Sequence, residues 1–71
     1  MRTDKINISY APLWVKLIEK NLKKSELREK TGIAASTFTK MGKNEYVSLE
    51  VLARIATALD CGIDDIVSII K

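Results

Sequence analysis

The sequence of 71 residues predicts an all-α fold, a compact domain of five short helices with a short N-terminal strand or arm. Three glycines and one proline leave few places for tight turns, which favours helices over a many-stranded barrel. Hydrophobic residues make up 46% of the chain and charged residues 30%, the balance of a folded domain rather than of a disordered one. Apolar residues also recur at helical spacing in several segments. We expect residues 1–11 to form the arm or strand and residues 12–71 to form the helical domain.

The first two elements are predicted from two different spacings of apolar residues along the chain. Apolar Ile6, Ile8 and Tyr10 alternate with polar residues, which predicts a short strand that must pair with another strand or remain an arm. A frayed terminus is the alternative. The first helix is expected over 12–20, because a proline is tolerated in the first helical turn and an apolar stripe follows it, made of Leu13, Trp14, Leu17 and Ile18. Trp14 is expected in the core.

Four more helices are expected along the rest of the chain. The second covers 24–31 and ends at Gly32, a left-handed C-terminal cap, and the third covers 34–41. The fourth covers 48–59, with Ser48 as its N-cap, and it has the strongest helical periodicity, formed by Leu49, Leu52, Ala53, Ala56 and Leu59. The fifth is expected from Ile63 to Ile70, where Asp64 and Asp65 suit the positive end of a helix dipole.

Several functions are excluded by counting residues. The chain has no His and one cysteine, Cys61, so it can build neither a zinc site nor a His-based catalytic triad. We therefore predict no enzyme, no cofactor, no metal site and no small-molecule ligand, and Asp64 and Asp65 are expected to be helix-cap charges. The apolar runs are shorter than the roughly 18 residues of a membrane span. A lone Cys without a signal peptide fits a reduced, cytoplasmic compartment.

The charge is distributed unevenly along the chain. Residues 1–44 hold ten basic and four acidic residues, a net charge of +6, whereas residues 45–71 hold two basic and five acidic ones, a net charge of −3. A basic front half of this kind indicates a polyanionic partner.

The segment 22–41 indicates which polyanion. It predicts two short helices separated by about three residues around Gly32, the spacing of a helix-turn-helix whose second helix lies in the DNA major groove. At about 100° per residue, one side of this second helix is apolar, and the opposite side carries short polar side chains and basic ones. Such a face can approach base edges without repelling phosphate. An ordinary amphipathic helix with a solvated polar face is the alternative.

A family resemblance rests on the residues of this segment and of those after it. Leu27, Gly32, Ile33, Phe38 and Met41, in this spacing, resemble the helix-turn-helix of the Cro and phage-repressor type, also called the xenobiotic-response-element family. The stretches 25–33, 48–60 and 61–66 are similar to that family's second helix and turn, its fourth helix and its fifth. The resemblance implies a DNA-binding transcriptional regulator over about residues 13–70.

The resemblance also implies which residues contact DNA. Lys24 lies where the family has a Gln in the first turn of its second helix, and four residues of the third helix take exposed recognition positions: Ala35, Ser36, Thr39 and Lys40. Lys43 and Asn44 follow the third helix, where the family contacts phosphate, and Thr37 completes the predicted DNA-binding set. Lys23 and Ala34 replace the family's usual capping residues, and Ala35 replaces a longer polar one.

The sequence therefore predicts a small regulator, a repressor, that binds duplex DNA as a homodimer with residues 34–41 in the major groove. The N-terminal strand and the end of the fifth helix are both candidate dimer interfaces. A protein-interaction module on the same fold, like an antitoxin or antirepressor, is the first alternative. A peptide that folds on a membrane surface is the second.

Overall fold

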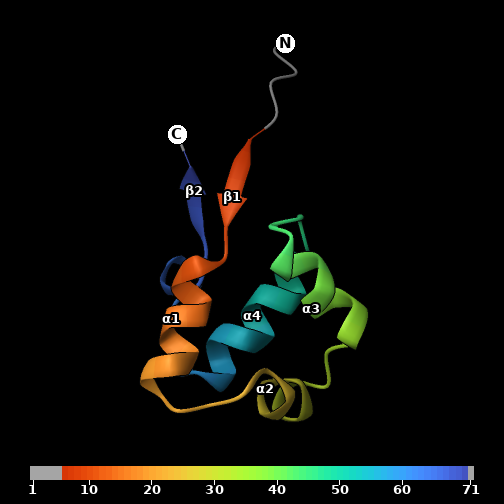
Figure 1. Ribbon diagram of the computed structural model, residues 1–71, viewed down its shortest axis with the longest axis vertical. Helices are drawn as coiled ribbons and strands as arrows, with labels where there is room; N and C mark the ends of the chain where they lie inside the picture. Colours follow the sequence, from red (N-terminus) through yellow and green to blue (C-terminus); the bar gives the residue numbers. More distant parts are fainter. Residues whose placement is uncertain (1–5, 71) are drawn as a thin grey trace.

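The computed structural model describes residues 6–70 as four α-helices, one turn of 3-10 helix and two short strands. The helices are α1 (Ala11–Glu19), α2 (Lys24–Thr31), α3 (Ala35–Gly42) and α4 (Leu49–Ala58), the 3-10 turn η1 is Ile63–Asp65, and the strands are β1 (Asn7–Ser9) and β2 (Ser68–Ile70). Figure 1 shows α4 in the middle of the molecule, with α1 and α3 on either side and α2 below. The predicted arm and domain boundaries include residues 1–5 and 71, which lie outside the described residues.

The four helices enclose one apolar core. Its fully buried side chains come from all four helices and from the residues next to α1 and η1, namely Tyr10, Leu13, Leu27, Met41, Ile55 and Ile66. Leu17, Ile33, Phe38, Ala56 and Leu59 complete the buried set. The core therefore joins the segment before α1 to both helices of the helix-turn-helix and to the segment after α4.

The predicted fifth helix is wrong. The chain makes only the single turn η1, and Ser68–Ile70 then forms β2, which pairs antiparallel with β1 in the register Ile8 opposite Ile69. Ile66, Val67, Ile69 and Ile70 are all β-branched, so they lose side-chain freedom in a helix and favour an extended strand. The Ile6–Tyr10 alternation correctly predicted a strand near the N-terminus, and β2 is the partner that this strand required.

The phase of two helices also needs correction. In α4 the buried residues are Ile55 and Ala56, followed by buried Leu59 at the C-cap, and Leu52 is partly buried, whereas Leu49 is 69% exposed. In α1 Leu13 and Leu17 are buried and Trp14 is partly buried against the core, but Ile18 is 78% exposed. Each predicted stripe therefore includes a residue at its edge that faces solvent, because helical spacing identifies the apolar side of a helix but not how far around the helix the core extends.

Candidate nucleic-acid interface

The turn between α2 and α3 has the geometry of a helix-turn-helix. Gly32 follows α2 in the left-handed conformation, with φ of 72°, and its N–H donates to the Arg28 carbonyl at 2.8 Å. Ile33 is buried, and extended Ala34 precedes the first turn of α3. The sequence correctly predicted the glycine cap and the bounds of α2, whereas α3 begins and ends one residue later than expected.

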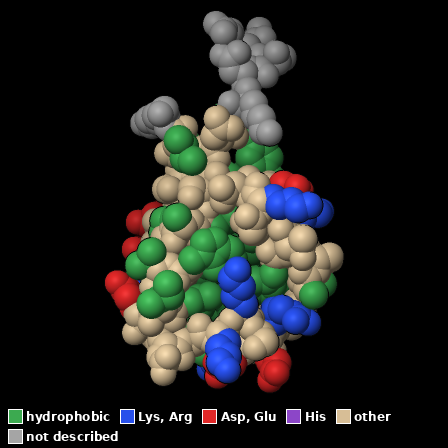
Figure 2. Space-filling view, in the orientation of Figure 1, with side chains coloured by type: hydrophobic (Ala, Val, Ile, Leu, Met, Phe, Trp, Pro, Cys, Tyr) green, Lys and Arg blue, Asp and Glu red, His purple; other side chains and the backbone are tan. Residues whose placement is uncertain are grey.

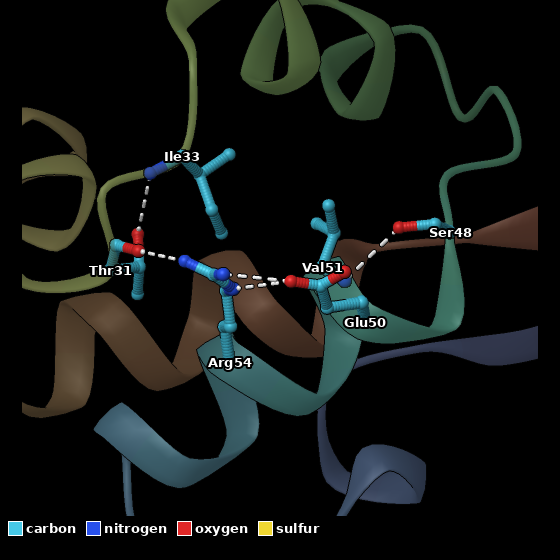
Figure 3. A network of polar contacts seen from close by, with 6 residues as sticks. All are labelled: Thr31, Ile33, Ser48, Glu50, Val51 and Arg54. Carbon is cyan, nitrogen blue, oxygen red and sulfur yellow. Dashed lines mark hydrogen bonds and ion pairs between the residues drawn. The ribbon is translucent and has the colours of Figure 1, made fainter.

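Polar contacts from α4 hold the end of α2 in place (Figure 3). The Arg54 guanidinium donates to the Thr31 carbonyl at 3.2 Å and to one Glu50 carboxylate oxygen at 2.7 and 3.0 Å. The Thr31 hydroxyl donates to the Leu27 carbonyl at 2.8 Å. Arg54 thus satisfies a backbone carbonyl that α2 itself leaves without a helical partner. At the start of α4, the Ser48 hydroxyl accepts from the Val51 N–H at 3.2 Å, which confirms the predicted N-cap.

The outer face of α3 carries most of the predicted contact residues. Ala35, Ser36, Thr39 and Lys40 are exposed there, while Phe38 and Met41 are buried on the opposite side. The Thr39 hydroxyl donates to the Ala35 carbonyl at 3.2 Å, which leaves its oxygen lone pairs free to accept. Thr37 differs from the other four, because it is partly buried and lines a shallow pocket with Lys40, Tyr46 and Val47. No acidic side chain lies on α3.

Lys24 lies at the start of α2 and is tied to α1. Its Nζ stands 4.2 Å from the centre of the Trp14 ring, within the range of a cation–π contact, and the side chain is exposed. The sequence predicted Lys24 as a contact residue and Trp14 as core, but their contact was not foreseen. Trp14 fills the core with one part of its ring and supports a surface cation with the other.

Lys43 and Asn44 are both exposed directly after α3, and of these two only the Asn44 side chain makes a hydrogen bond within the described residues. The Asn44 Oδ1 accepts from the Tyr10 N–H at 3.1 Å, in a residue whose φ is 57°. The buried Tyr10 hydroxyl donates to the Glu45 carbonyl at 2.7 Å, and the Tyr46 hydroxyl donates to the Ile6 carbonyl. These three contacts fix the loop after α3 against β1.

Sequence reasoning missed the structural role of Tyr10, and it left open whether Tyr46 packs on the domain or contacts a partner. Tyr10 was assigned only to an alternating strand, although a phenol that enters a core needs a hydrogen-bond acceptor and this need was a usable signal. Burial raises the pKa of the Tyr10 phenol above its ordinary value of 10.0, and a backbone contact with Val47 offsets part of this rise.

Charged side chains of both signs are visible on one face of the molecule. In the space-filling view, lysine and arginine side chains lie at the centre, right and bottom of this face (Figure 2). Acidic side chains lie along the left edge, and others lie beside basic side chains at the upper right and the bottom. Asp65 belongs to the acidic half of the sequence, and its Oδ2 accepts from the Gly62 N–H at 3.0 Å and so caps η1 rather than a longer helix.

Other kinds of site find little support within residues 6–70. No group of three His, Cys, Asp or Glu side chains gathers there, and no helix of that range is long and apolar enough to cross a membrane. Cys61 is a free thiol, partly buried against the core.

The arrangement of α2, the Gly32 turn and α3 defines a helix-turn-helix domain. A model of the Cro/C1-type HTH DNA-binding domain matches residues 12–71, and the chain therefore belongs to this family. The chain is also similar to the crystal structure of the transcriptional regulator VanUg (form II), with a TM-score of 0.92 and 44% identity over 99% of this chain and 93% of that one. A search of curated proteins gave no match.

Proposed function

We propose that this protein is a small transcriptional regulator that binds duplex DNA sequence-specifically, with α3 in the major groove. The observation that carries the proposal is the outer face of α3, where Ala35, Ser36, Thr39 and Lys40 are exposed and no side chain is acidic. A helix with short side chains approaches base edges closely, and one without carboxylates is not repelled by phosphate. The family's DNA-binding domain and the similarity to a transcriptional regulator support the same conclusion.

Each residue of this face has a chemical role in the proposal. Lys40 donates to guanine O6 and N7, and the methyl group of Ala35 contacts a thymine methyl. Ser36 donates or accepts at a base edge. Thr39 accepts from an exocyclic amino group, because its own proton is directed to the Ala35 carbonyl. Thr37 belongs to the interface as a phosphate-side contact, since it lines the pocket beside Tyr46 rather than the outer face.

The flanking residues position the domain. Lys24 and Lys43 contact phosphates on either side of α3, which orients the helix without reading sequence. Lys24 reaches its phosphate from the Trp14 ring that supports it. Asn44 uses its amide NH₂ on phosphate, because its Oδ1 already accepts from Tyr10.

The regulatory part of the proposal is a homodimeric repressor in the cytoplasm. One recognition helix covers only a few base pairs, and helix-turn-helix proteins read two half-sites about one helical turn apart by pairing across a twofold axis. A protein bound over a promoter excludes the polymerase from that DNA, so repression is the expected effect.

Selection from random oligonucleotides tests this function directly. We expect the purified protein to enrich one sequence, arranged as an inverted repeat, and to bind it with an affinity that falls steeply as salt rises. Lys40→Ala is expected to relax the enriched sequence at one base pair of each half-site, while Lys16→Ala, on α1, serves as a control with the same loss of charge. Binding to a protein partner that does not change with salt, together with no enriched sequence, would instead support the protein-interaction module.

A further inference from the structure

A cavity of about 490 Å³ lies between the two strands and the loop after α3. This loop stands beside β1 (Figure 1), and hydrogen bonds from Asn44 to Tyr10 and from Tyr46 to Ile6 hold the two together. The cavity is lined by residues 6–8 and 43–46 and by Ile70. Its volume is within the range of sites that bind small molecules, about 300–1,000 Å³.

The apolar part of the lining consists mainly of side chains that are exposed to solvent. Ile6, Tyr46 and Ile70 are 59%, 57% and 52% exposed, and all three line the cavity. Ile8 also lines it and packs against the core. Exposed apolar side chains that gather in one place mark a binding site, because a ligand with an apolar group removes their surface from water.

Polar groups of both signs line the same cavity. Lys43 carries a positive charge and Glu45 a negative one, and both residues are exposed. Asn44 lies between them and accepts from the Tyr10 N–H through its Oδ1, so its NH₂ is the part of the amide that can donate to a ligand. Lys43 and Asn44 therefore offer donors to an anionic group, and Glu45 offers an acceptor to a cationic group.

We infer that this cavity binds a small zwitterion with an apolar side chain, either an apolar amino acid or a short peptide. The carboxylate of this ligand accepts from the Lys43 ammonium and the Asn44 amide, and its ammonium donates to the Glu45 carboxylate. A molecule with one charge forms only one of these two charge-assisted contacts. The sequence predicted no small-molecule ligand, and no local pattern indicates the cavity, because its lining comes from three separate segments of the chain.

The cavity shares Lys43 and Asn44 with the proposed DNA interface. The regulatory part of the inference rests on the proposed function, in which both residues contact phosphate. A ligand carboxylate and a DNA phosphate compete for the same ammonium and amide donors. The bound zwitterion therefore lowers the affinity for duplex DNA, and DNA lowers the affinity for the zwitterion by the same factor.

Nuclear magnetic resonance titration of the full chain tests the site in the absence of DNA. Four probes share one apolar side chain: leucine and leucyl-leucine carry both charges, N-acetylleucine carries only the negative one, and leucinamide carries only the positive one. We expect the amide signals of Ile8, Asn44 and Tyr46 to shift with a zwitterion that binds about tenfold more tightly than either single-charge probe. The tighter of the two zwitterions identifies the ligand as an amino acid or a peptide. The inference is overturned if no probe shifts these signals or if a single-charge probe binds as tightly.

Two variants test the assigned contacts. Lys43→Ala should weaken binding of the tighter zwitterion by about tenfold, and Glu45→Gln should weaken it as much without weakening the binding of N-acetylleucine. Glu45→Gln leaves the backbone carbonyl that accepts from Tyr10 in place. Lys20→Ala is the matched control, because Lys20 is exposed at the end of α1, lies outside the cavity and loses the same charge as Lys43. Equal zwitterion affinity of Lys43→Ala and this control would overturn the inference.

A DNA-binding arm separates the inference from the proposed function. Saturating zwitterion should raise the dissociation constant of the wild-type protein for the selected duplex by about fivefold or more, and leucinamide at the same concentration should leave it unchanged. A zwitterion that binds without changing DNA affinity would overturn the regulatory part. A chain that binds the zwitterion but no duplex would overturn the proposed function and leave the site intact, whereas a chain that binds only the duplex would overturn the inference alone.

Discussion

At the scale of single residues, three lysines surround α3 in different environments. Lys40 projects from the outer face of the helix, Lys43 follows the helix end, and Lys24 stands over Trp14 on a neighbouring helix. All three are exposed, so each keeps its charge available for DNA. The proposed function gives base reading to Lys40 and phosphate binding to the other two.

Alanine substitutions distinguish these roles. Lys24→Ala and Lys43→Ala should weaken binding to every duplex and reduce the slope of log affinity against log salt by about one unit each. Lys40→Ala should cost about 1–3 kcal/mol on the selected site and relax preference at one base pair. Fluorescence titrations over a salt series measure both effects. If all three variants lost affinity equally on every duplex, α3 would contribute only electrostatic attraction, and the assignment of base reading to Lys40 would be contradicted.

Tyr10 predicts a response of stability to pH. Because burial raises its pKa above 10.0, the neutral phenol is favoured in the folded state, and its contribution is fully present below pH 10. This contribution is lost as pH rises through the folded-state pKa, where the ionised hydroxyl no longer donates to the Glu45 carbonyl. Thermal melting between pH 8 and about 11.5 should show a steeper loss of Tm for the wild type than for Tyr10→Phe. Parallel curves would contradict this account.

At the scale of elements, the sequence predicts the parts whose boundaries are set locally. Gly32 ends α2 by its own conformational freedom, Ser48 caps α4 with its own hydroxyl, and both residues were identified from sequence alone. The segment after η1 was misassigned because its isoleucines fit a helical period and a strand equally well in so short a run. Only the presence of β1, about 60 residues away in the chain, decides for the strand.

In the candidate site, too, locally determined features were predicted from the sequence, and contacts between separate elements were not. The exposed and buried sides of α3 follow from helical phase, so Ser36, Lys40, Phe38 and Met41 were placed correctly. The contacts of Lys24 with Trp14 and of Asn44 with Tyr10 join separate elements. No local pattern specifies them, because they depend on how α1 packs against its neighbours.

The corrected phase of α4 predicts which of its residues stabilise the fold. Ile55 is fully buried, so Ile55→Ala should lower the free energy of unfolding by about 2–5 kcal/mol through lost burial and the cavity left behind. Leu49→Ala is the control on the same helix, where 69% exposure limits the change to about 0.5 kcal/mol. Urea denaturation followed by circular dichroism measures both. A larger loss of unfolding free energy for Leu49→Ala than for Ile55→Ala would contradict this assignment and support the buried face of α4 that was expected from the sequence.

At the scale of the whole molecule, the helix-turn-helix and the pair of strands lie at opposite ends of the fold. α2 and α3 form the helix-turn-helix, and the two strands β1 and β2 extend away from the helices at the end opposite α2 (Figure 1). The loop after α3 connects them, because Asn44 and Tyr46 hydrogen-bond to the backbone at either end of β1. These two contacts hold the segment that follows α3 in a fixed position against β1.

Methylation interference on the selected duplex tests the central claim, that α3 reads the major groove. Dimethyl sulfate methylates guanine N7, which faces the major groove, and adenine N3, which faces the minor groove. We predict that N7-methylguanine within each half-site blocks binding by the wild-type protein and that this block weakens at one position for Lys40→Ala. Interference from N3-methyladenine alone, or binding that tolerates every N7-methylguanine, would contradict the claim.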